Sequence, residues 1–211
     1  MIFTIRHLGT APLKTARLTL RRLTADDAEA MHRNWASDPE VYRYMTSRRM
    51  PEIDDVRRFI AQKLEAYESA DTYYWAVVCD ADGENIGMAT LTEVLTYART
   101  ANLAYSLGRR WWGQGYAHEA AEAVLAFAFE QVGFRKIYGC HFVGNERSGL
   151  VLRACGMRHV GRSGSPIYHH GEYLSFERYE LTAKQYELRR HTQARPRFHS
   201  LRNHAETDFF E

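Results

Sequence analysis

The turn at residues 110–117, Arg-Trp-Trp-Gly-Gln-Gly-Tyr-Ala, contains the residue types that could hold a phosphate group. It follows a predicted strand and opens a predicted helix, whose first N–H groups have no partner within the helix and carry partial positive charge. A diphosphate placed there would accept several hydrogen bonds at once. Gly113 and Gly115 have no Cβ to block its approach, and both can adopt positive φ. The turn therefore predicts a diphosphate site.

Two other phosphate-binding motifs do not fit this turn. The Gly-Lys-Ser/Thr sequence of nucleoside triphosphatases is absent from the chain. A dinucleotide-binding fold would need a third glycine and a βαβ unit, whereas this turn comes after a predicted β-meander. An ordinary strand-to-helix turn with structural glycines is the alternative interpretation.

Hydrophobic periodicity predicts the elements that must position the turn. Alternating leucines predict a strand over 17–23, and Thr24 is expected to cap a helix that ends near residue 36. Apolar residues at helical spacing predict a second helix within 51–69. The other predicted strands are 73–79, 85–95, 101–107, 137–143, 158–162 and 172–181, and the other predicted helices are 116–132 and 146–155. This order predicts one α/β domain over residues 1–188.

The composition is typical of a single globular domain. Its 211 residues, 45% hydrophobic and 26% charged, can form one core. No apolar stretch is long enough to cross a bilayer and no signal peptide is present, so we expect a cytoplasmic protein without membrane contact. Three cysteines without metal-ligand spacing predict buried, reduced thiols and no metal site. With a net charge of +2, the chain lacks the broad basic surface expected of a protein that binds nucleic acid. The arginine-rich residues 189–211 are expected to form a mobile or partner-docking basic extension.

Two motifs together resemble a known family. The string Trp-Gly-Gln-Gly-Tyr-Ala-His-Glu-Ala at 112–120 and the Asn145-x-x-Ser148 helix, ending in Cys-Gly-Met at 155–157, are similar to the acyl-CoA signature of the GCN5-related N-acetyltransferase (GNAT) superfamily. The branch they most resemble includes the ribosomal-protein N-terminal acetyltransferases. The resemblance covers about residues 15–182. It implies a mixed, mostly antiparallel central sheet with helices on both faces, and acetyl-CoA as the acyl donor.

The resemblance also implies where acetyl-CoA would bind. In this superfamily the strand before the glycine-containing turn splays from the next strand, and the cofactor arm lies in the gap. That assigns Tyr105, Ser106 and Leu107 to the arm, with Asn145 and Ser148 near its thioester end. The turn residues assigned to the cofactor are Arg110, Trp112, Gly113, Gln114, Gly115, Tyr116 and Ala117.

Acetyl transfer needs a neutral amine and a proton for the leaving thiolate. Many superfamily members supply that proton from a Tyr where this chain has Leu152, so the branch resemblance makes Ser148 the candidate acid. A first-turn helix hydroxyl without function is the alternative for this Ser. Glu93 is the first candidate base. Glu172, Glu177 or a relayed water are its alternatives, and an exposed strand carboxylate is the alternative interpretation of Glu93 itself.

The acceptor is expected to be a primary amine, either a protein N-terminus or a small molecule. The resemblance places Trp35, Tyr42 and Tyr44 on the acceptor side, although core packing is the commoner role of such residues. Branch members often have acidic residues where this chain has Asn102 and Ser175, which leaves the acceptor open. A non-catalytic acyl-CoA sensor or docking module is the competing function, and homodimers are frequent in the superfamily.

Overall fold

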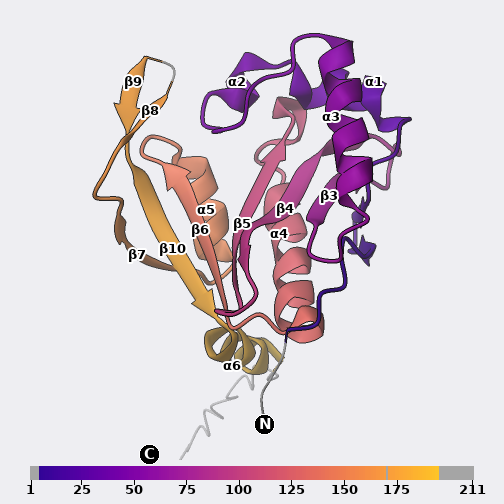
Figure 1. The fold of residues 1–211 in the computed structure, drawn as a ribbon. Coiled ribbons are helices and arrows are strands. Elements are labelled where there is room, and N and C mark those ends of the chain that lie inside the picture. The colour runs from indigo at the N-terminus through magenta and orange to yellow at the C-terminus, as the bar shows by residue number, and fades with distance from the viewer. Residues whose placement is uncertain (1–4, 170, 195–211) are drawn as a thin grey trace, which may run out of the picture.

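A large twisted sheet forms the centre of the computed structural model, which describes residues 5–169 and 171–194 (Figure 1). Its eight strands lie in the order β1-β2-β3-β4-β5-β6-β10-β7. All neighbours are antiparallel except β5 and β6, which are parallel. The strands are β1 (Leu13–Lys14), β2 (Leu18–Arg21), β3 (Tyr73–Cys79), β4 (Asn85–Leu95), β5 (Thr100–Leu107), β6 (Lys136–Phe142), β7 (Arg158–Arg162) and β10 (Phe176–Thr182). The predicted mixed, mostly antiparallel sheet is confirmed.

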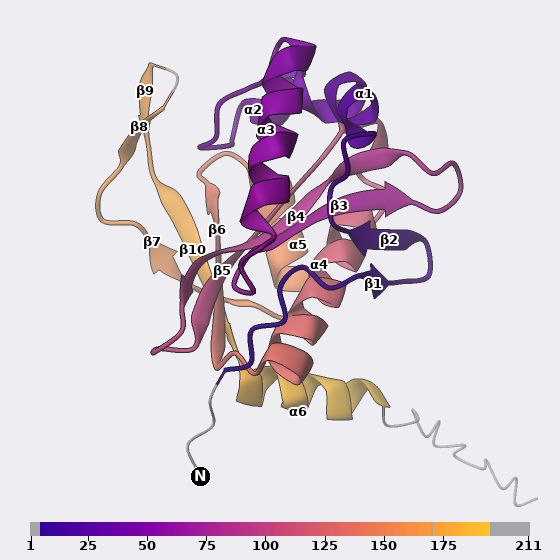
Figure 2. The ribbon, with the colours of Figure 1, turned by 45° about the vertical axis from the view of Figure 1, so that its right-hand side comes forward.

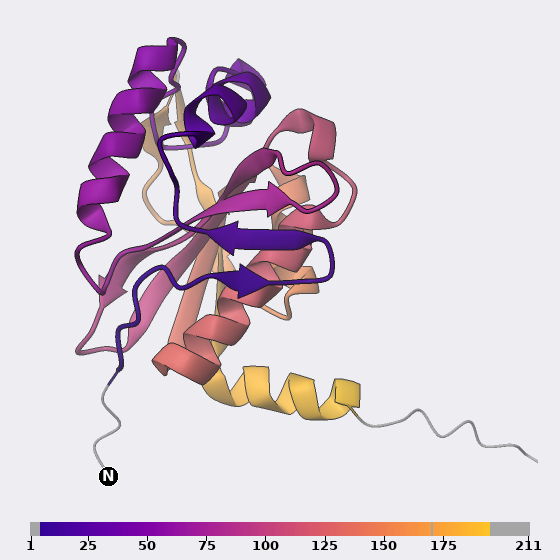
Figure 3. The ribbon, with the colours of Figure 1, turned by 90° about the vertical axis from the view of Figure 1, so that its right-hand side faces the viewer.

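Helices cover both faces of this sheet (Figures 2 and 3). One face carries α1 (Asp27–Met31), the π-helical turn η1 (His32–Ala36), α2 (Pro39–Tyr42) and α3 (Ile53–Ala66). The other carries α4 (Tyr116–Ala126), its π-helical continuation η3 (Phe127–Val132) and α5 (Glu146–Ala154). Each face has its own core of buried side chains. Within the described ranges, no helix combines the length and the apolar character needed to span a membrane.

The first helix after the glycine-containing turn forms where the sequence predicts it. Gly115 precedes α4 with φ +82, and Gly133 ends its continuation with φ +87, so both ends use the left-handed conformation that glycine tolerates. The face of α4 toward the sheet is fully buried and consists of small and branched apolar residues, which let the helix lie close to the strands. Its N-terminus is thereby fixed at the upper end of β5.

The parallel strands β5 and β6 diverge partway along their length. Only residues 100–103 of β5 pair with β6, in register with residues 136–139. Beyond this point β5 continues to Leu107 and β6 to Phe142 without pairing to each other, and the two strands form an open V in Figure 1. The backbone groups of 104–107 that face β6 therefore have no strand partner. This confirms the splay that the family resemblance implied.

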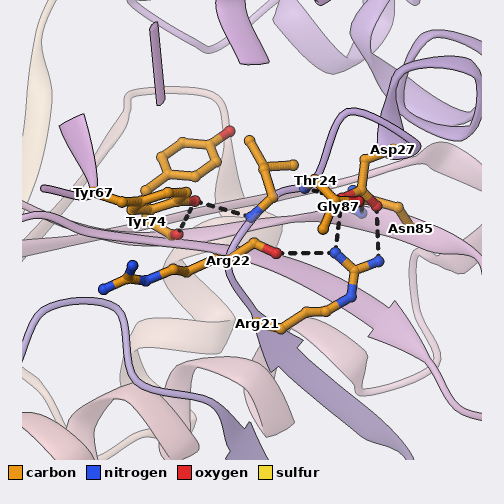
Figure 4. A network of polar contacts seen from close by, with 9 residues as sticks. Arg21, Arg22, Thr24, Asp27, Tyr67, Tyr74, Asn85 and Gly87 are labelled. Carbon is orange, nitrogen blue, oxygen red and sulfur yellow. Dashed lines mark hydrogen bonds and ion pairs between the residues drawn. The ribbon is translucent and has the colours of Figure 1, made fainter. Parts of the chain in front are cut away.

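The N-terminal helix begins differently from the prediction. Thr24 does not cap it; instead its N–H and hydroxyl donate to Oδ2 of Asp27, at 2.7 and 3.2 Å. Asp27 also accepts two hydrogen bonds from Arg21 at 2.7 and 2.9 Å and one from Asn85 at 3.2 Å (Figure 4). The carboxylate is only 4% exposed, so it joins β2, α1 and β4 through buried contacts. Asp27 is thus a structural centre and not simply an acidic residue of a first helical turn.

Several elements are not predicted by the sequence pattern. The predicted strand 172–181 is divided at Ser175 into β9 (Glu172–Leu174) and β10, and β9 pairs with β8 (Ile167–His169) in a separate hairpin. The described part of the chain ends with α6 (Ala183–Ala194), which passes the predicted domain boundary at residue 188. Tyr186 of α6 is buried against Phe129, with ring centroids 4.9 Å apart. The rest of the predicted extension, 195–211, lies outside the described residues.

The cysteine prediction is correct for two thiols and wrong for the third. Cys79 and Cys155 are buried and unpaired, but Cys140 is exposed. Cys140 follows the last residue of β6 that pairs with β5, so the diverging strands leave its side open. It lines the cleft described next.

Candidate active site

A cleft of about 2260 Å³ contains almost all of the predicted site residues. Its wall is built from the α2 and α3 region, β3 to β6, the glycine-containing turn and α5. The predicted residues that line it are Trp35, Tyr42, Tyr44, Glu93, Tyr105, Ser106, Leu107, Trp112, Gly113, Gly115, Tyr116, Ala117, Asn145 and Ser148. The open part of the β5–β6 gap lies in the middle of this wall. Helices α4 and α5 lie on one side of the gap, and α1 to α3 lie on the other.

The glycine-containing turn presents a row of free backbone donors. Among the described residues, the six amide N–H groups of residues 113–118 have no hydrogen-bond acceptor, whereas the next amide, of Glu119, donates to the Gly115 carbonyl at 3.0 Å. The amide of Trp112, which we expected in this row, instead donates to the Arg109 carbonyl at 3.1 Å. Gly113 and Gly115 have φ of +75 and +82, which aligns successive amides as an anion-binding concavity.

The side chains of Arg110 and Gln114 stand outside the cleft wall. Arg110 is exposed and lies over the ring of Trp111 at 5.3 Å, and the Gln114 side chain donates to the Arg110 carbonyl at 2.7 Å. Trp112 does line the cleft, and its indole N–H donates to the Leu107 carbonyl at 2.7 Å. Gln114 thus stabilises the turn, while Trp112 fixes the end of β5.

A distant ion pair holds the turn from behind. Arg17 donates to the Gln114 carbonyl at 3.0 Å, and its guanidinium lies 2.6 Å from Glu119 and 4.2 Å from the ring centre of Tyr116. Thr15 also donates to Glu119, at 2.7 Å. Burial would raise the pKa of Glu119, but the hydrogen bonds from Thr15 and Arg17 lower it below its usual value. The carboxylate therefore stays ionised and keeps Arg17 against the turn.

Asn145 and Ser148 meet Tyr105 on the other side of the gap. The Asn145 side chain caps α5 by accepting the Ser148 N–H at 3.4 Å. The Tyr105 hydroxyl donates to the Ser148 carbonyl at 2.9 Å and lies 3.1 Å from Ser148 Oγ. Burial raises the pKa of Tyr105 well above its ordinary value, so the phenol stays protonated. Because the Tyr105 hydroxyl donates its hydrogen to the Ser148 carbonyl, its oxygen can accept a hydrogen bond from the Ser148 hydroxyl and orient that group in the gap. This contact between β5 and α5 is not visible in the sequence.

The candidate bases occupy different environments. Glu93 is exposed on the cleft wall at a bulge of β4, where it adopts φ +51. Glu177 is ion-paired with Arg162 at 2.6 Å and hydrogen-bonded to His159 at 2.7 Å, outside the cleft wall. These two partners lower the pKa of Glu177. Glu172 lies on β9, also outside the wall. Only Glu93 of the three can therefore meet a molecule bound in the cleft.

The predicted acceptor residues form the opposite wall. Trp35 and Tyr42 are buried in the core beneath α3, and both line the cleft. Tyr44 reaches across the opening and lies against Gly144. A Cβ atom added at Gly144 would lie 3.5 Å from the Tyr44 hydroxyl. The neighbouring Arg43 carbonyl contacts His169 of the β8–β9 hairpin at 3.1 Å. Residues 43 and 44 thus bridge the two sides of the cleft.

His118 belongs to a cluster beside α6. The side-chain atoms of His118, Glu122 and Cys155 that could bind a metal all lie within 4.8 Å of one another. Both oxygens of Glu122, however, accept hydrogen bonds from Arg189 at 2.6 Å. This carboxylate is therefore already neutralised by a guanidinium, and the cluster is best described as an ion-pair network that attaches α6 to α4.

The comparison with protein families decides the identity of this fold. Residues 17–158 match the model of the acetyltransferase (GNAT) domain, which is more than half of the chain. The chain belongs to the GNAT acetyltransferase family. It is therefore an acetyltransferase, from a family that uses acetyl-CoA.

Relatives of this GNAT chain support the same assignment. It is 28% identical to the uncharacterized N-acetyltransferase YoaA of Bacillus subtilis, over 75% of this chain and 89% of the relative. It is 26% identical to the [ribosomal protein uS5]-alanine N-acetyltransferase of Escherichia coli, over 46% of this chain and 50% of that enzyme. The fold is similar to that of the ribosomal-protein-S5-alanine acetyltransferase of Vibrio fischeri, with a TM-score of 0.74 at 16% identity, covering 83% of this chain and 98% of that one.

In this GNAT enzyme, Glu119→Gln is expected to weaken acetyl-CoA binding about three- to tenfold. The carboxamide keeps the size of the side chain but loses the ion pair to Arg17, which at this partly exposed position is worth about 1 kcal/mol. Calorimetric titration with acetyl-CoA measures the change. Glu177→Gln is the matched control, because it removes a similar ion pair outside the cleft wall. Equal affinities for the two variants would show that the pair does not support the turn.

Proposed function

We propose that this enzyme binds acetyl-CoA across the β5–β6 gap and transfers its acetyl group directly to a primary amine. The observation that carries the proposal is the row of six unpartnered amides at 113–118, which leads into the unpaired edge of β5. Amides at a helix N-terminus fit a diphosphate, and an open strand edge fits the amide groups of a pantetheine arm. No Cβ obstructs the turn at Gly113 or Gly115. The donor set and the shape of the gap therefore match one extended ligand.

The proposed cofactor contacts follow from this placement. The amides of 113–118 would hold the diphosphate, and the backbone of Tyr105, Ser106 and Leu107 would pair with the arm. Asn145 and Ser148 would lie near the thioester end. When bound, acetyl-CoA supplies an activated acetyl group that passes to the amine nitrogen with release of CoA. The gap joins the two sides of the cleft, so the acceptor can approach from the side of Trp35, Tyr42 and Tyr44.

The side chains at the gap supply proton transfers. Ser148 Oγ can pass its proton to the departing sulfur, and the Tyr105 hydroxyl, 3.1 Å away, can then donate to the Ser148 oxygen that remains. Glu93, on the acceptor side of the cleft, can take the proton released by the amine, directly or through water. The base has little to do, because an amine near its own pKa loses a proton readily. The function is therefore acetyl transfer with modest acid–base assistance.

The test is acetyl-CoA turnover with a panel of small amines and peptides with free N-termini, measured by CoA release and by mass of the product. We expect an acetylated amine with the wild-type enzyme. Ser148→Ala should lower kcat about tenfold or more with little change in KM for acetyl-CoA, because only the proton donor is lost. Ser47→Ala, an exposed serine on the same cleft wall, should behave as wild type. A wild-type enzyme that binds no acetyl-CoA would contradict the proposal.

A further inference from the structure

Lys63 presents a cation to the cleft without an anionic partner. It lies on α3, is half-buried, and lines the cleft. Its ammonium is 5.2 Å from the ring centre of Phe59 and 5.0 Å from that of Tyr74. Among the described residues it has no hydrogen bond and no carboxylate within 4.0 Å. Burial lowers its pKa. The two aromatic faces, worth about 1 kcal/mol each, hold the cation in place. The ammonium is not among the polar atoms shielded from solvent, so an anion that enters the cleft can pair with it.

Two tyrosine hydroxyls on the same cleft wall can donate hydrogen bonds to such an anion. The hydroxyls of Tyr42 and Tyr74 have no hydrogen bond to any described residue, and they are not among the polar atoms shielded from solvent, so both are open to the cleft. Burial raises the pKa of both phenols, so they remain donors. The indole N–H of Trp35, by contrast, is shielded from solvent and has no acceptor in the described part of the chain, so a molecule in the cleft does not contact it.

These three groups form one subsite. Tyr42 and Tyr74 belong to a single buried cluster against which Phe59 packs, they interact electrostatically with each other, and both line the cleft with Lys63. The groups come from α2, α3 and β3, so the tertiary fold, and not one local motif, brings them together. We name Lys63, Tyr42 and Tyr74 the donor subsite.

The protein's own carboxylates on the cleft wall do not serve the donor subsite. Asp55 is ion-paired with Arg58, and Glu40 lies 3.9 Å from Arg43. Glu93 and Glu146 have no ion pair with Lys63 or with any other described cation. Among the described residues, the donor subsite therefore has no anion of its own and is open to one carried by a bound molecule.

The donor subsite is also within reach of the reacting gap. Thr90 of β4 pairs with Tyr74 of β3 on one side and with Ala104 of β5 on the other. Tyr74 therefore lies two strand spacings, about 10 Å, from the splayed edge of β5. A molecule whose amine and oxygen anion are about 10 Å apart, the span of about three extended residues, can contact both places.

We propose that the acceptor of this enzyme is an amine that also carries a carboxylate, and that the donor subsite binds this carboxylate. The inference rests on the proposed acetyl transfer at the β5–β6 gap, and it defines the chemical class of the acceptor. Lys63 supplies the countercharge, and the hydroxyls of Tyr42 and Tyr74 supply hydrogen bonds. Polyamines and other purely cationic amines are excluded from this subsite by Lys63.

The test compares matched acceptors with and without the negative charge. Tripeptides with a free C-terminus are compared with their C-terminal amides, and 6-aminohexanoate with 6-aminohexanamide, so that peptide and non-peptide sources are distinguished. We expect kcat/KM at least tenfold higher for the carboxylate form in one or both pairs. Lys63→Met should bring the ratio close to one, because the carboxylate form loses its countercharge and the amide form does not. Arg48→Met, an exposed cation at the same cleft, should keep the wild-type ratio.

Equal use of carboxylate and amide by the wild type, or a preference that survives in Lys63→Met, would overturn the inference. If Lys63→Met does not fold by thermal melting, Tyr42→Phe replaces it and should reduce the ratio about threefold. An enzyme that turns over no amine contradicts the proposed function instead. In that case, calorimetric titration of the same pairs into the CoA-saturated protein decides the inference by binding alone.

Discussion

Replacing Gly113 with leucine is expected to weaken acetyl-CoA binding at least a hundredfold. Gly113 lies on the cleft wall at the start of the six free amides, and a Cβ there would meet no protein atom within 4 Å. The new side chain would therefore occupy space that the ligand needs. Losing two hydrogen bonds to a charged diphosphate costs about 3–6 kcal/mol, which corresponds to a factor of a hundred or more. Calorimetric titration of acetyl-CoA into the variant measures this loss directly.

Gly83→Leu controls for backbone strain in this experiment. Gly83 has φ +71, close to the +75 of Gly113, and likewise has no atom within 4 Å of an added Cβ. It lies in the exposed turn between β3 and β4, away from the cleft wall. In both variants, a leucine held in the left-handed conformation therefore destabilises the fold by a similar amount, about 1–2 kcal/mol. If the two variants bound acetyl-CoA equally well, the turn would not be the diphosphate site.

The cofactor side of the cleft was largely predictable because its signal is local. Gly113 and Gly115 are close in sequence, and the apolar face of the following helix fixes where its N-terminus lies. The splay of β5 and β6 could be inferred only through the family resemblance, because nothing in the two strand sequences specifies where pairing stops. The unsatisfied amides of 113–118 then follow from the same local turn geometry.

The supports of the site could not be predicted, because they depend on contacts distant in sequence. Arg17 and Glu119 are separated by 102 positions, and Tyr105 and Ser148 by 43. Lys63 shows no distinguishing pattern within its amphipathic helix, and its role depends on Tyr42 and Tyr74, which other elements supply. Glu93 shows a further limit: its position on the wall depends on a bulge with φ +51, which few non-glycine residues adopt. Pattern and propensity carry no such information.

The hydrogen-bond network around Asp27 was missed for the same reason, and it connects stability to the acceptor side. Asp27 joins β2 to Asn85 of β4, and in the same region Tyr67 donates to the Tyr74 carbonyl at 2.7 Å and accepts the Leu23 N–H at 3.1 Å (Figure 4). These contacts fix α1 and β3, and β3 carries Tyr74 of the donor subsite. Damage to the network should therefore disturb acceptor binding more than acetyl-CoA binding.

Asp27→Asn is expected to lower the free energy of unfolding by about 2–3 kcal/mol at pH 7. Breaking a fully buried pair costs about 3–5 kcal/mol, and the value is smaller here because the Arg21 side chain keeps 34% of its exposure to water. The amide also presents N–H donors to Arg21 and Thr24, which are themselves donors. Urea unfolding measures the loss. Asp26→Asn, at the exposed neighbouring aspartate, should change it by less than about 0.5 kcal/mol.

The same variant should also change how stability depends on pH. Burial by itself would raise the pKa of Asp27, but hydrogen bonds from Arg21, Thr24 and Asn85 outweigh it and lower the pKa below its ordinary value. The unfolded chain therefore binds a proton more readily at this residue, and its stabilising effect is complete above the unfolded pKa of about 3.9 and lost as pH falls through the folded pKa. The stability difference between wild type and Asp27→Asn should accordingly be largest at pH 7 and shrink toward pH 3. A difference that stays constant over this range would mean that the carboxylate's charge does not stabilise the fold.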